Sequence, residues 1–178
     1  NVAAQIGDVI VVMVNYEDST GSGLGSCAWP GAVFADLVEV MYGNVISYTC
    51  DLVTLRVNVA GVQTVTFEPN FATSAAVMIV TVWRGLLNGL FDRQASNQVP
   101  PDLPGNDANS GLTAPTSQAH ELVLGCASFI TAFAAGGAWW PPLLFGNSQQ
   151  TGSAPHPAEI EEGYYISHAI GQFYAKYW

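Results

Sequence analysis

Short runs of apolar residues, many of them β-branched, recur along this chain and end at polar or turn-forming residues. Residues 8–15 (DVIVVMVN) and 75–83 (AAVMIVTVW) are continuous runs of strand length, and a shorter one covers 121–125 (ELVLG). Uninterrupted apolar runs of this length are typical of strands that are buried on both faces. We therefore predict buried strands over these three segments.

Residues 52–68 show a different pattern, in which apolar and polar positions alternate. Leu55 and its apolar neighbours alternate with Arg56 and other polar residues, and the alternation resumes after Gly61. A period of two predicts strands with one face in the core. Gly61 can adopt the positive φ that a tight turn needs. The pattern predicts a β-hairpin over this segment.

Two further segments are compatible with either a helix or a strand. The apolar positions of 33–42 match a helical stripe, but the β-branched content of this segment favours a strand. The aromatic residues of 159–178, interrupted by Gly163 and Gly171, favour two terminal strands over a helix. We predict strands in both segments.

Many short strands, separated by Gly/Pro turns and without a fixed-period repeat, predict an all-β protein. The expected architecture is an antiparallel β-sandwich of the jelly-roll or Ig-like kind. The length of 178 residues fits one domain over residues 1–178, with long loops at about 88–115 and 146–157. The uncharged stretch 122–145 is long enough to span a bilayer. Its internal Gly and Pro residues favour two strands joined by a loop, so no membrane span is expected.

Charge is scarce in this sequence and has one dominant sign. Charged residues make up 10% of the chain, with 14 acidic against 4 basic residues and a net charge of −10. Nucleic acids and anionic membrane surfaces are excluded as partners, because binding them needs clustered Lys and Arg. The low charge and the mean hydropathy of +0.27 favour a subunit buried among its neighbours over a monomer from an acidic, hot or saline habitat.

The cysteines and the first residue bear on the compartment. The chain starts at Asn1 without Met, which is expected where a signal peptide has been removed. We predict a disulfide between Cys27 and Cys50, which would close a loop of roughly two dozen residues and stabilise the fold by about 3 kcal/mol. Cys126 is interpreted as a small buried hydrophobe. The absence of a Cys-x-x-Cys pair argues against zinc or redox chemistry.

The sequence offers no recognisable catalytic site, cofactor site or metal site. Its three histidines lack metal-binding spacing. The pair Glu17-Asp18 is interpreted as a solvated turn and not as a calcium loop. The acidic residues 159, 161 and 162 are interpreted as an acidic edge strand and not as a glycosidase pair. No Gly-x-Ser-x-Gly motif is present. The expected protein is not an enzyme.

Trp139 and Trp140 are the most conspicuous aromatic pair, because they follow Gly136-Gly137 and precede two prolines. Three interpretations stay open: a packed loop within the domain, a contact between subunits, and a stacking platform for a glycan. No Asn-x-Ser/Thr sequon occurs, so N-linked sugar is not expected, although O-linked sugar fits the Ser/Thr-rich loops.

Five segments, taken in order, resemble the β-sandwich domains that recur in bacterial and phage extracellular or surface proteins. Those domains have a "G-D-L-L-V-V" strand, an "N-T-V-T-V-T-F" hairpin, an "E-Y-S-G-L" segment and an "A-N-E-L-L-V-G" strand. The matching segments here are GDVIVVMV (7–14), VNVAGVQTVTF (57–67), VTVWRGL (80–86), AHELVLG (119–125) and GYYISHAIGQFYA (163–175). The resemblance implies the fold and an outside location, and it carries no catalytic residues to transfer.

The ends of the chain depart from that family. Its members usually have one or two strands before the segment that matches 7–14, and a further apolar strand at the end. A sandwich without edge strands exposes unpaired backbone, which a strand from a neighbouring copy can cover. We therefore expect a non-enzymatic structural protein of the cell or virion exterior that forms a homopolymer, most simply an extracellular filament. The alternatives are a capsid-decorating protein and a carbohydrate-binding adhesion domain.

Overall fold

The computed structural model describes residues 1–18, 25–28, 32–42, 47–69, 75–86, 92–93, 95, 108–129, 143–151, 158–173 and 176–177. All the regular elements in these ranges are strands, so the protein is all-β, as the sequence pattern predicts. The described part of the chain contains no helix that could cross a bilayer. The strands are β1 (Val2–Ala4), β2 (Val9–Asp18), β3 (Gly25–Ala28), β4 (Ala32–Tyr42), β5 (Ser47–Val57), β6 (Gly61–Gln63), β7 (Thr66–Pro69), β8 (Ala76–Trp83), β9 (Ala108–Asn109), β10 (Leu122–Phe129), β11 (Leu144–Thr151), β12 (Ala158–Ile166) and β13 (Lys176–Tyr177).

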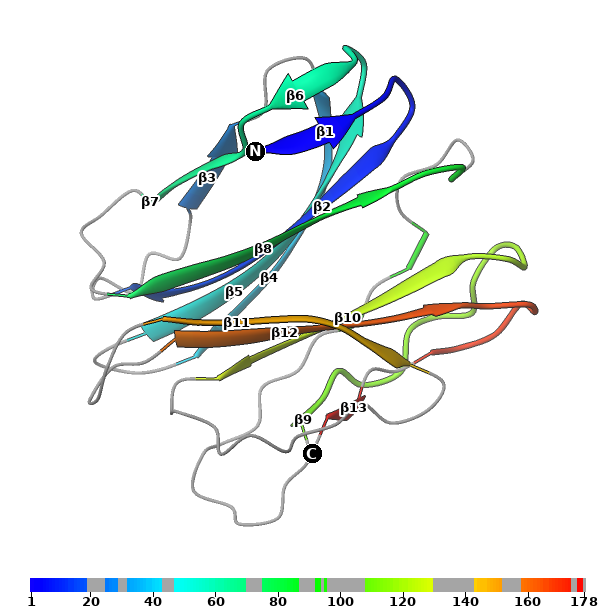
Figure 1. Ribbon diagram of the computed structural model, residues 1–178. Coiled ribbons are helices and arrows are strands. Elements are labelled where there is room, and N and C mark those ends of the chain that lie inside the picture. The colour runs from blue at the N-terminus through cyan, green and yellow to red at the C-terminus, as the bar shows by residue number, and fades with distance from the viewer. Residues whose placement is uncertain are drawn as a thin grey trace.

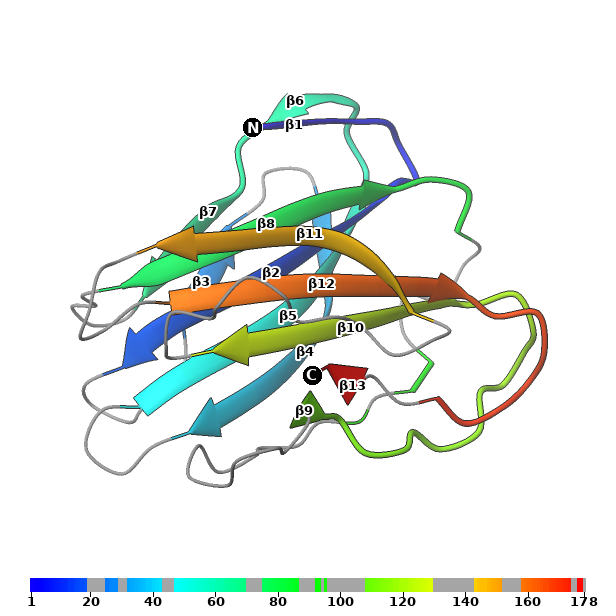
Figure 2. The same ribbon diagram turned by 60° about the horizontal axis from the view of Figure 1, so that its bottom comes forward.

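The strands form several antiparallel sheets. A four-stranded sheet has the order β4-β5-β2-β8, and a three-stranded sheet has the order β10-β12-β11. Figure 1 shows the four-stranded sheet lying between the two-stranded pairs β1-β6 and β3-β7 on one side and the three-stranded sheet on the other. Figure 2 shows the three-stranded sheet with the small β13-β9 pair beside it. The four-stranded sheet is therefore covered on both faces.

Strand β2 lies at the centre of this arrangement. It pairs with β5 from Val9↔Arg56 to Asp18↔Ser47 and with β8 along its other edge. Because successive side chains of a strand point to opposite faces, its even-numbered and odd-numbered apolar residues enter two different cores. Those side chains, from Val9 to Tyr16, are at most 2% exposed. The predicted strand with two buried faces is confirmed here.

The first core lies between the four-stranded sheet and the N-terminal strands. It contains the even-numbered residues of β2 together with Val53, Leu55 and Val57 of β5, and Ala4 and Val65 from the covering segments. Phe67 of β7 packs against it, with its ring centroid 4.9 Å from that of Tyr16. This core attaches the N-terminal strands to the central sheet.

The second core lies between the four-stranded and three-stranded sheets. It contains the odd-numbered residues of β2, Val77 and Ile79 of β8, and Ile160 of β12, which is fully buried. Cys50, Leu52, Leu124 and Cys126 pack around these residues. Because side chains alternate along a strand, the burial of Ile160 in this core shows that the even-numbered side chains near it on β12 face the four-stranded sheet.

The predicted hairpin over 52–68 is wrong in its pairing. Strand β5 pairs with β2 and β4, whereas β6 pairs with β1 and β7 pairs with β3. Alternation shows which side chains face a core, but it does not identify the partner strand. The expectation for Gly61 is confirmed, since its φ is +136°.

The other element predictions have mixed outcomes. Strand β4 confirms the prediction for 33–42, and β12 and β13 confirm strands within 159–178. The predicted loop over 146–157 is wrong at its start, because β11 continues to Thr151. Within the predicted loop 88–115, residues 108–109 form the short strand β9, and most of the remainder lies outside the described residues.

Candidate functional site

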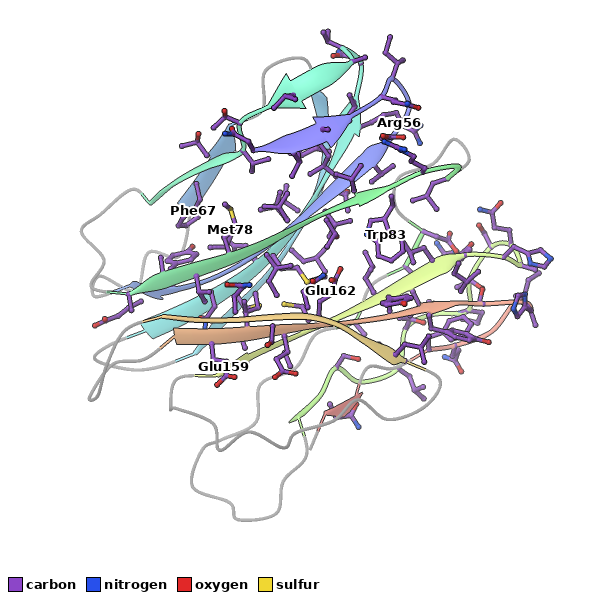
Figure 3. The ribbon with its side chains drawn as sticks, viewed as in Figure 1. Arg56, Phe67, Met78, Trp83, Glu159 and Glu162 are labelled. Atoms are coloured by element: carbon purple, nitrogen blue, oxygen red, sulfur yellow. The ribbon has the colours of Figure 1, made fainter. Side chains whose placement is uncertain are left out.

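A buried carboxylate lies between the two larger sheets. Glu162 of β12 is 1% exposed and sits on the face of its strand that turns toward the four-stranded sheet. Its Oε1 accepts a hydrogen bond from Thr81 Oγ1 of β8 at 3.1 Å, and its Oε2 accepts one from Asn147 Nδ2 of β11 at 2.6 Å. Trp83 Nε1 donates to Thr81 Oγ1 at 3.0 Å. We call these four residues the Glu162 cluster; Figure 3 labels Glu162 and Trp83 in the region between the sheets.

The local sequence around Asn147 makes room for this carboxylate. A Cβ built on Gly146 would lie 2.7 Å from Glu162 Oε2, closer than real side chains approach. Strand β11 also shifts register against β12 between Phe145 and Ser148. Such an irregularity re-aims a side chain locally. The glycine and the register shift together let Asn147 donate to Glu162.

The Glu162 cluster links the two larger sheets through side-chain hydrogen bonds. Both carboxylate oxygens already accept hydrogen bonds from neutral donors, and hydrogen bonds to a charged group are among the stronger ones in proteins. A glycosidase needs a second carboxyl group facing the first across a cleft. The neighbouring Glu161 is on the opposite face of β12, because side chains alternate along a strand. The arrangement favours a structural role for Glu162.

The expected acidic edge strand is therefore wrong. Strand β12 is the middle strand of its sheet, paired with β10 and β11, and Glu161 and Glu162 are both buried. Charged residues in a sequence usually indicate a solvent-exposed position. Glu162 is an exception, because its hydrogen bonds compensate the cost of burying a carboxylate. One signal could have identified it: Glu162 shares a strand face with Ile160 and Tyr164, both apolar in character.

Two cysteines meet beside this cluster. Cys50 of β5 and Cys126 of β10 have their sulfur atoms 3.3 Å apart, and Cys126 is directly opposite Glu162 in the pairing of β10 with β12. The pKa of the Cys126 thiol is raised well above its usual value, first by the hydrogen bond with Cys50, then by burial, and also by the negative charges of Glu162 and Asp51. Cys126 is expected from the sequence to be buried and is partly buried here, whereas no sequence pattern indicates its contact with Cys50.

The structure does not bring Cys50 to Cys27. Cys50 is a free thiol that packs against the second core. Cys27 is on β3, opposite Phe67 of β7, and Phe67 packs against the first core. The four-stranded sheet therefore separates β3 from the face on which Cys50 lies. The side chain of Cys27 is outside the described side chains, so the Cys27–Cys50 bridge stays a prediction that this placement disfavours.

The other residues singled out in the sequence lie elsewhere. Trp139, Trp140 and His156 are outside the described residues. His120 and His168 are exposed and lie together, with their Nδ1 atoms 3.4 Å apart and His120 at a φ of +60°. Within the described ranges no group of three or more metal-binding side chains is assembled.

Exposed aliphatic side chains gather at one end of the molecule. Ile6, Val59 and Val62 are 70%, 53% and 73% exposed, and we call these three residues the N-terminal surface. The turns that carry Ile6 and Val59 are adjacent, because Gly7 N donates to the carbonyl oxygen of Val57 at 2.9 Å, and Val62 is on the neighbouring strand β6. Strand β1 also pairs with β6 here, as Figure 1 shows.

The fold and these features define an all-β protein of covered antiparallel sheets. No family model, curated protein or solved structure matches this chain. Its function is therefore argued from its own residues.

Proposed function

We propose that this chain is a non-enzymatic structural protein that self-assembles on the exterior of a cell or virion as the subunit of an extracellular filament. The proposal includes a single β-sandwich domain over residues 1–178. The packing of the four-stranded sheet on the three-stranded sheet around the second core supports a sandwich, because two sheets packed face to face enclose a core of this kind. The low charge of the chain supports burial among neighbours.

The observation that carries the proposal is the N-terminal surface. Single exposed aliphatic residues are normal on a protein, but a group of them on one surface is typical of an interaction site. Ile6, Val59 and Val62 form such a group on a small sheet. Covering each of these side chains would contribute roughly 1–2 kcal/mol to an interface.

Charge supports a second copy of this chain as the partner. Arg56 and Arg84 lie beside the N-terminal surface, at the end of the central sheet where Val9 begins β2. Glu159 lies at the opposite end, beside Asn15, whose Nδ2 donates to the carbonyl oxygen of Glu159 at 2.9 Å. Figure 3 shows Arg56 and Glu159 at opposite ends of the molecule.

Because Asp8 pairs with Arg84 at 3.2 Å, Arg56 supplies the net positive charge of the N-terminal end, and Glu159 supplies negative charge at the opposite end. This difference in charge favours head-to-tail association. With a net charge of −10, copies repel one another unless oppositely charged regions meet. A contact between two different surfaces repeats without closing whenever its rotation does not complete a ring, and it then produces a filament. Exchange of the three-residue strand β1 between neighbours would strengthen the same contact.

The test is electron microscopy and light scattering of the purified chain over a range of concentrations. We expect filaments that shorten as salt is added, because salt screens the contact between charged ends. The double variant Ile6→Ser/Val62→Ser should lower assembly at least tenfold. Leu112→Ser is the matched control, since Leu112 is 62% exposed and away from the N-terminal surface.

Two results would contradict the proposal. A chain that stays monomeric at high concentration is no filament subunit, and a double variant that assembles like the unmodified chain removes the N-terminal surface from the contact. Closed shells, or binding only to a preformed capsid, would favour the capsid-decorating alternative. Retention of the chain on a glycan column through Trp139 and Trp140 would favour an adhesion domain.

A further inference from the structure

Cys50 and Cys126 come from strands of different sheets. Cys50 is on β5 of the four-stranded sheet, and Cys126 is on β10 of the three-stranded sheet, 76 positions further along the chain. Their sulfur atoms approach to 3.3 Å, and both residues pack against the second core. The pair is therefore a junction between the two sheets with the right chemistry for a covalent bond.

We propose that Cys50 and Cys126 form a disulfide that bonds the four-stranded sheet to the three-stranded sheet. The sulfur atoms need to move together by roughly 1.3 Å to reach the bonded separation of about 2.05 Å. Side-chain rotation can supply a movement of that size. The bond goes beyond the proposed function, although the exterior location proposed above is the kind of compartment in which disulfides persist.

The bond forms by exchange with a small disulfide such as oxidised glutathione. The thiolate of one cysteine attacks a glutathione sulfur, forms a mixed disulfide and releases one glutathione thiolate. The second cysteine then attacks the protein sulfur of that mixed disulfide and releases the second glutathione thiolate. The two cysteines lose two protons and two electrons, and glutathione disulfide gains the electrons as two reduced molecules.

The surroundings of the pair indicate when the bond forms. The hydrogen bond with Cys50, burial, and the negative charges of Glu162 and Asp51 all oppose formation of the Cys126 thiolate in the folded protein. Because the thiolate is the reacting form, exchange is slow once the sheets have closed over the pair. The disulfide is therefore expected to form during folding, before the second core is complete.

The experiment refolds the reduced, unfolded chain with oxidised and reduced glutathione, so that access to the thiols does not limit the reaction. Proteolysis without reductant and mass spectrometry then identify the linked peptides. We expect a Cys50–Cys126 peptide, loss of the mass of two hydrogen atoms, and a fall from three free thiols to one. Cys27→Ala should form the same bond, and Cys126→Ala should not.

Thermal unfolding provides a second readout. The bond closes a loop of more than seventy residues, so oxidised Cys27→Ala should unfold about 10 °C above its reduced form. Cys50→Ala/Cys126→Ala, which cannot form the bond, should show no such difference. This double variant, alanine at both junction positions, also separates the two proposals, since it should still assemble into filaments.

Two outcomes overturn the inference. The first is a Cys27–Cys50 peptide from the unmodified chain, which would restore the prediction made from the sequence. The second is Cys27→Ala that refolds to the native strand content with both remaining thiols still reactive toward a thiol reagent. Loss of filaments with an intact Cys50–Cys126 bond would instead count against the proposed function alone.

Discussion

The two cores on either side of the four-stranded sheet are held together differently. In the first core, aliphatic and aromatic residues such as Ile10 and Tyr16 pack against the N-terminal strands. Across the second core, apolar packing around Ile160 is joined by the Glu162 cluster and the cysteine pair. Apolar packing is non-directional, whereas hydrogen bonds fix how far and in which register two surfaces approach. The first core therefore supplies stability, and the second also specifies how its sheets align.

The largest expected effect comes from a cavity in the first core. Ile10→Ala should lower the free energy of unfolding by about 3–4 kcal/mol, because Ile10 is fully buried between rigid strands. Urea unfolding followed by circular dichroism measures the change. Ile10→Val is the control and should cost about 1 kcal/mol. An Ile10→Ala loss below 1 kcal/mol would show that the N-terminal strands contribute little to this core.

Removing the hydrogen bonds of the Glu162 cluster should have the next largest effect on the free energy of unfolding. Glu162→Ala removes the acceptor for Thr81 and Asn147 and should cost about 2–3 kcal/mol, since it deletes a buried side chain together with both of its hydrogen bonds. Glu162→Gln keeps a side chain of the same shape and should cost about 1 kcal/mol. Both are measured by urea unfolding. Equal losses for the two variants would mean that cavity formation, and not hydrogen bonding, determines the cost.

The contrast between the cores also separates what the sequence reveals from what it hides. The uninterrupted run 8–15 predicts a strand with two buried faces, and the structure confirms it, because apolar periodicity is a local signal. The partners of β5 and β6 are not local: alternation is satisfied equally by a hairpin and by the pairing with β1 and β2 that occurs. Strand pairing therefore had to come from the structure.

The candidate site was hidden for a related reason. The run of acidic residues that includes Glu162 predicts an edge strand, because negative charges there discourage unwanted pairing. Burial of Glu162 depends instead on donors distant in the sequence, from residue 81 on β8 and residue 147 on β11. Cys126, expected to be a buried hydrophobe, is partly buried against the second core, and its neighbour Cys50 is 76 positions away and on another sheet. Linear spacing carries no information about contacts between sheets.

A smaller effect should follow from crowding the carboxylate without removing it. Gly146→Ala places a Cβ against Glu162 Oε2 and should cost about 1–2 kcal/mol, because the carboxylate is held by Thr81 and Asn147 and cannot move freely. In the Glu162→Ala background, the same substitution should cost only a few tenths of a kcal/mol. A double-mutant cycle by urea unfolding measures this coupling. Additive losses would show that Gly146 is needed for its backbone and not for the space it leaves.

The smallest effect on the free energy of unfolding is expected at Glu121, a partly buried residue that directly precedes β10. The pKa of Glu121 is raised, first by burial and then by the negative charge of Asp92. A raised carboxyl pKa favours the protonated form in the folded state, so the stability linked to this group is present at low pH and is lost as pH rises through the folded-state pKa. Glu121→Gln should therefore stabilise the protein at pH 7 by a few tenths of a kcal/mol, with solvent screening limiting the gain.

The pH dependence gives this last prediction its control. At about pH 3 the carboxyl of Glu121 is protonated in both states, so the difference between Glu121→Gln and the unmodified chain should vanish. The pKa of Asp92 is shifted in the opposite direction: it is lowered, mainly because the backbone N–H of Ser117 donates a hydrogen bond to its carboxylate. Asp92→Asn should therefore destabilise at pH 7, and its effect should fade as pH falls through the pKa of Asp92. If Glu121→Gln instead destabilises the protein at pH 7, the hydrogen bonds of the Glu121 carboxylate stabilise the fold by more than its burial costs. Glu121 would then resemble Glu162, whose buried charge is compensated by hydrogen-bond donors.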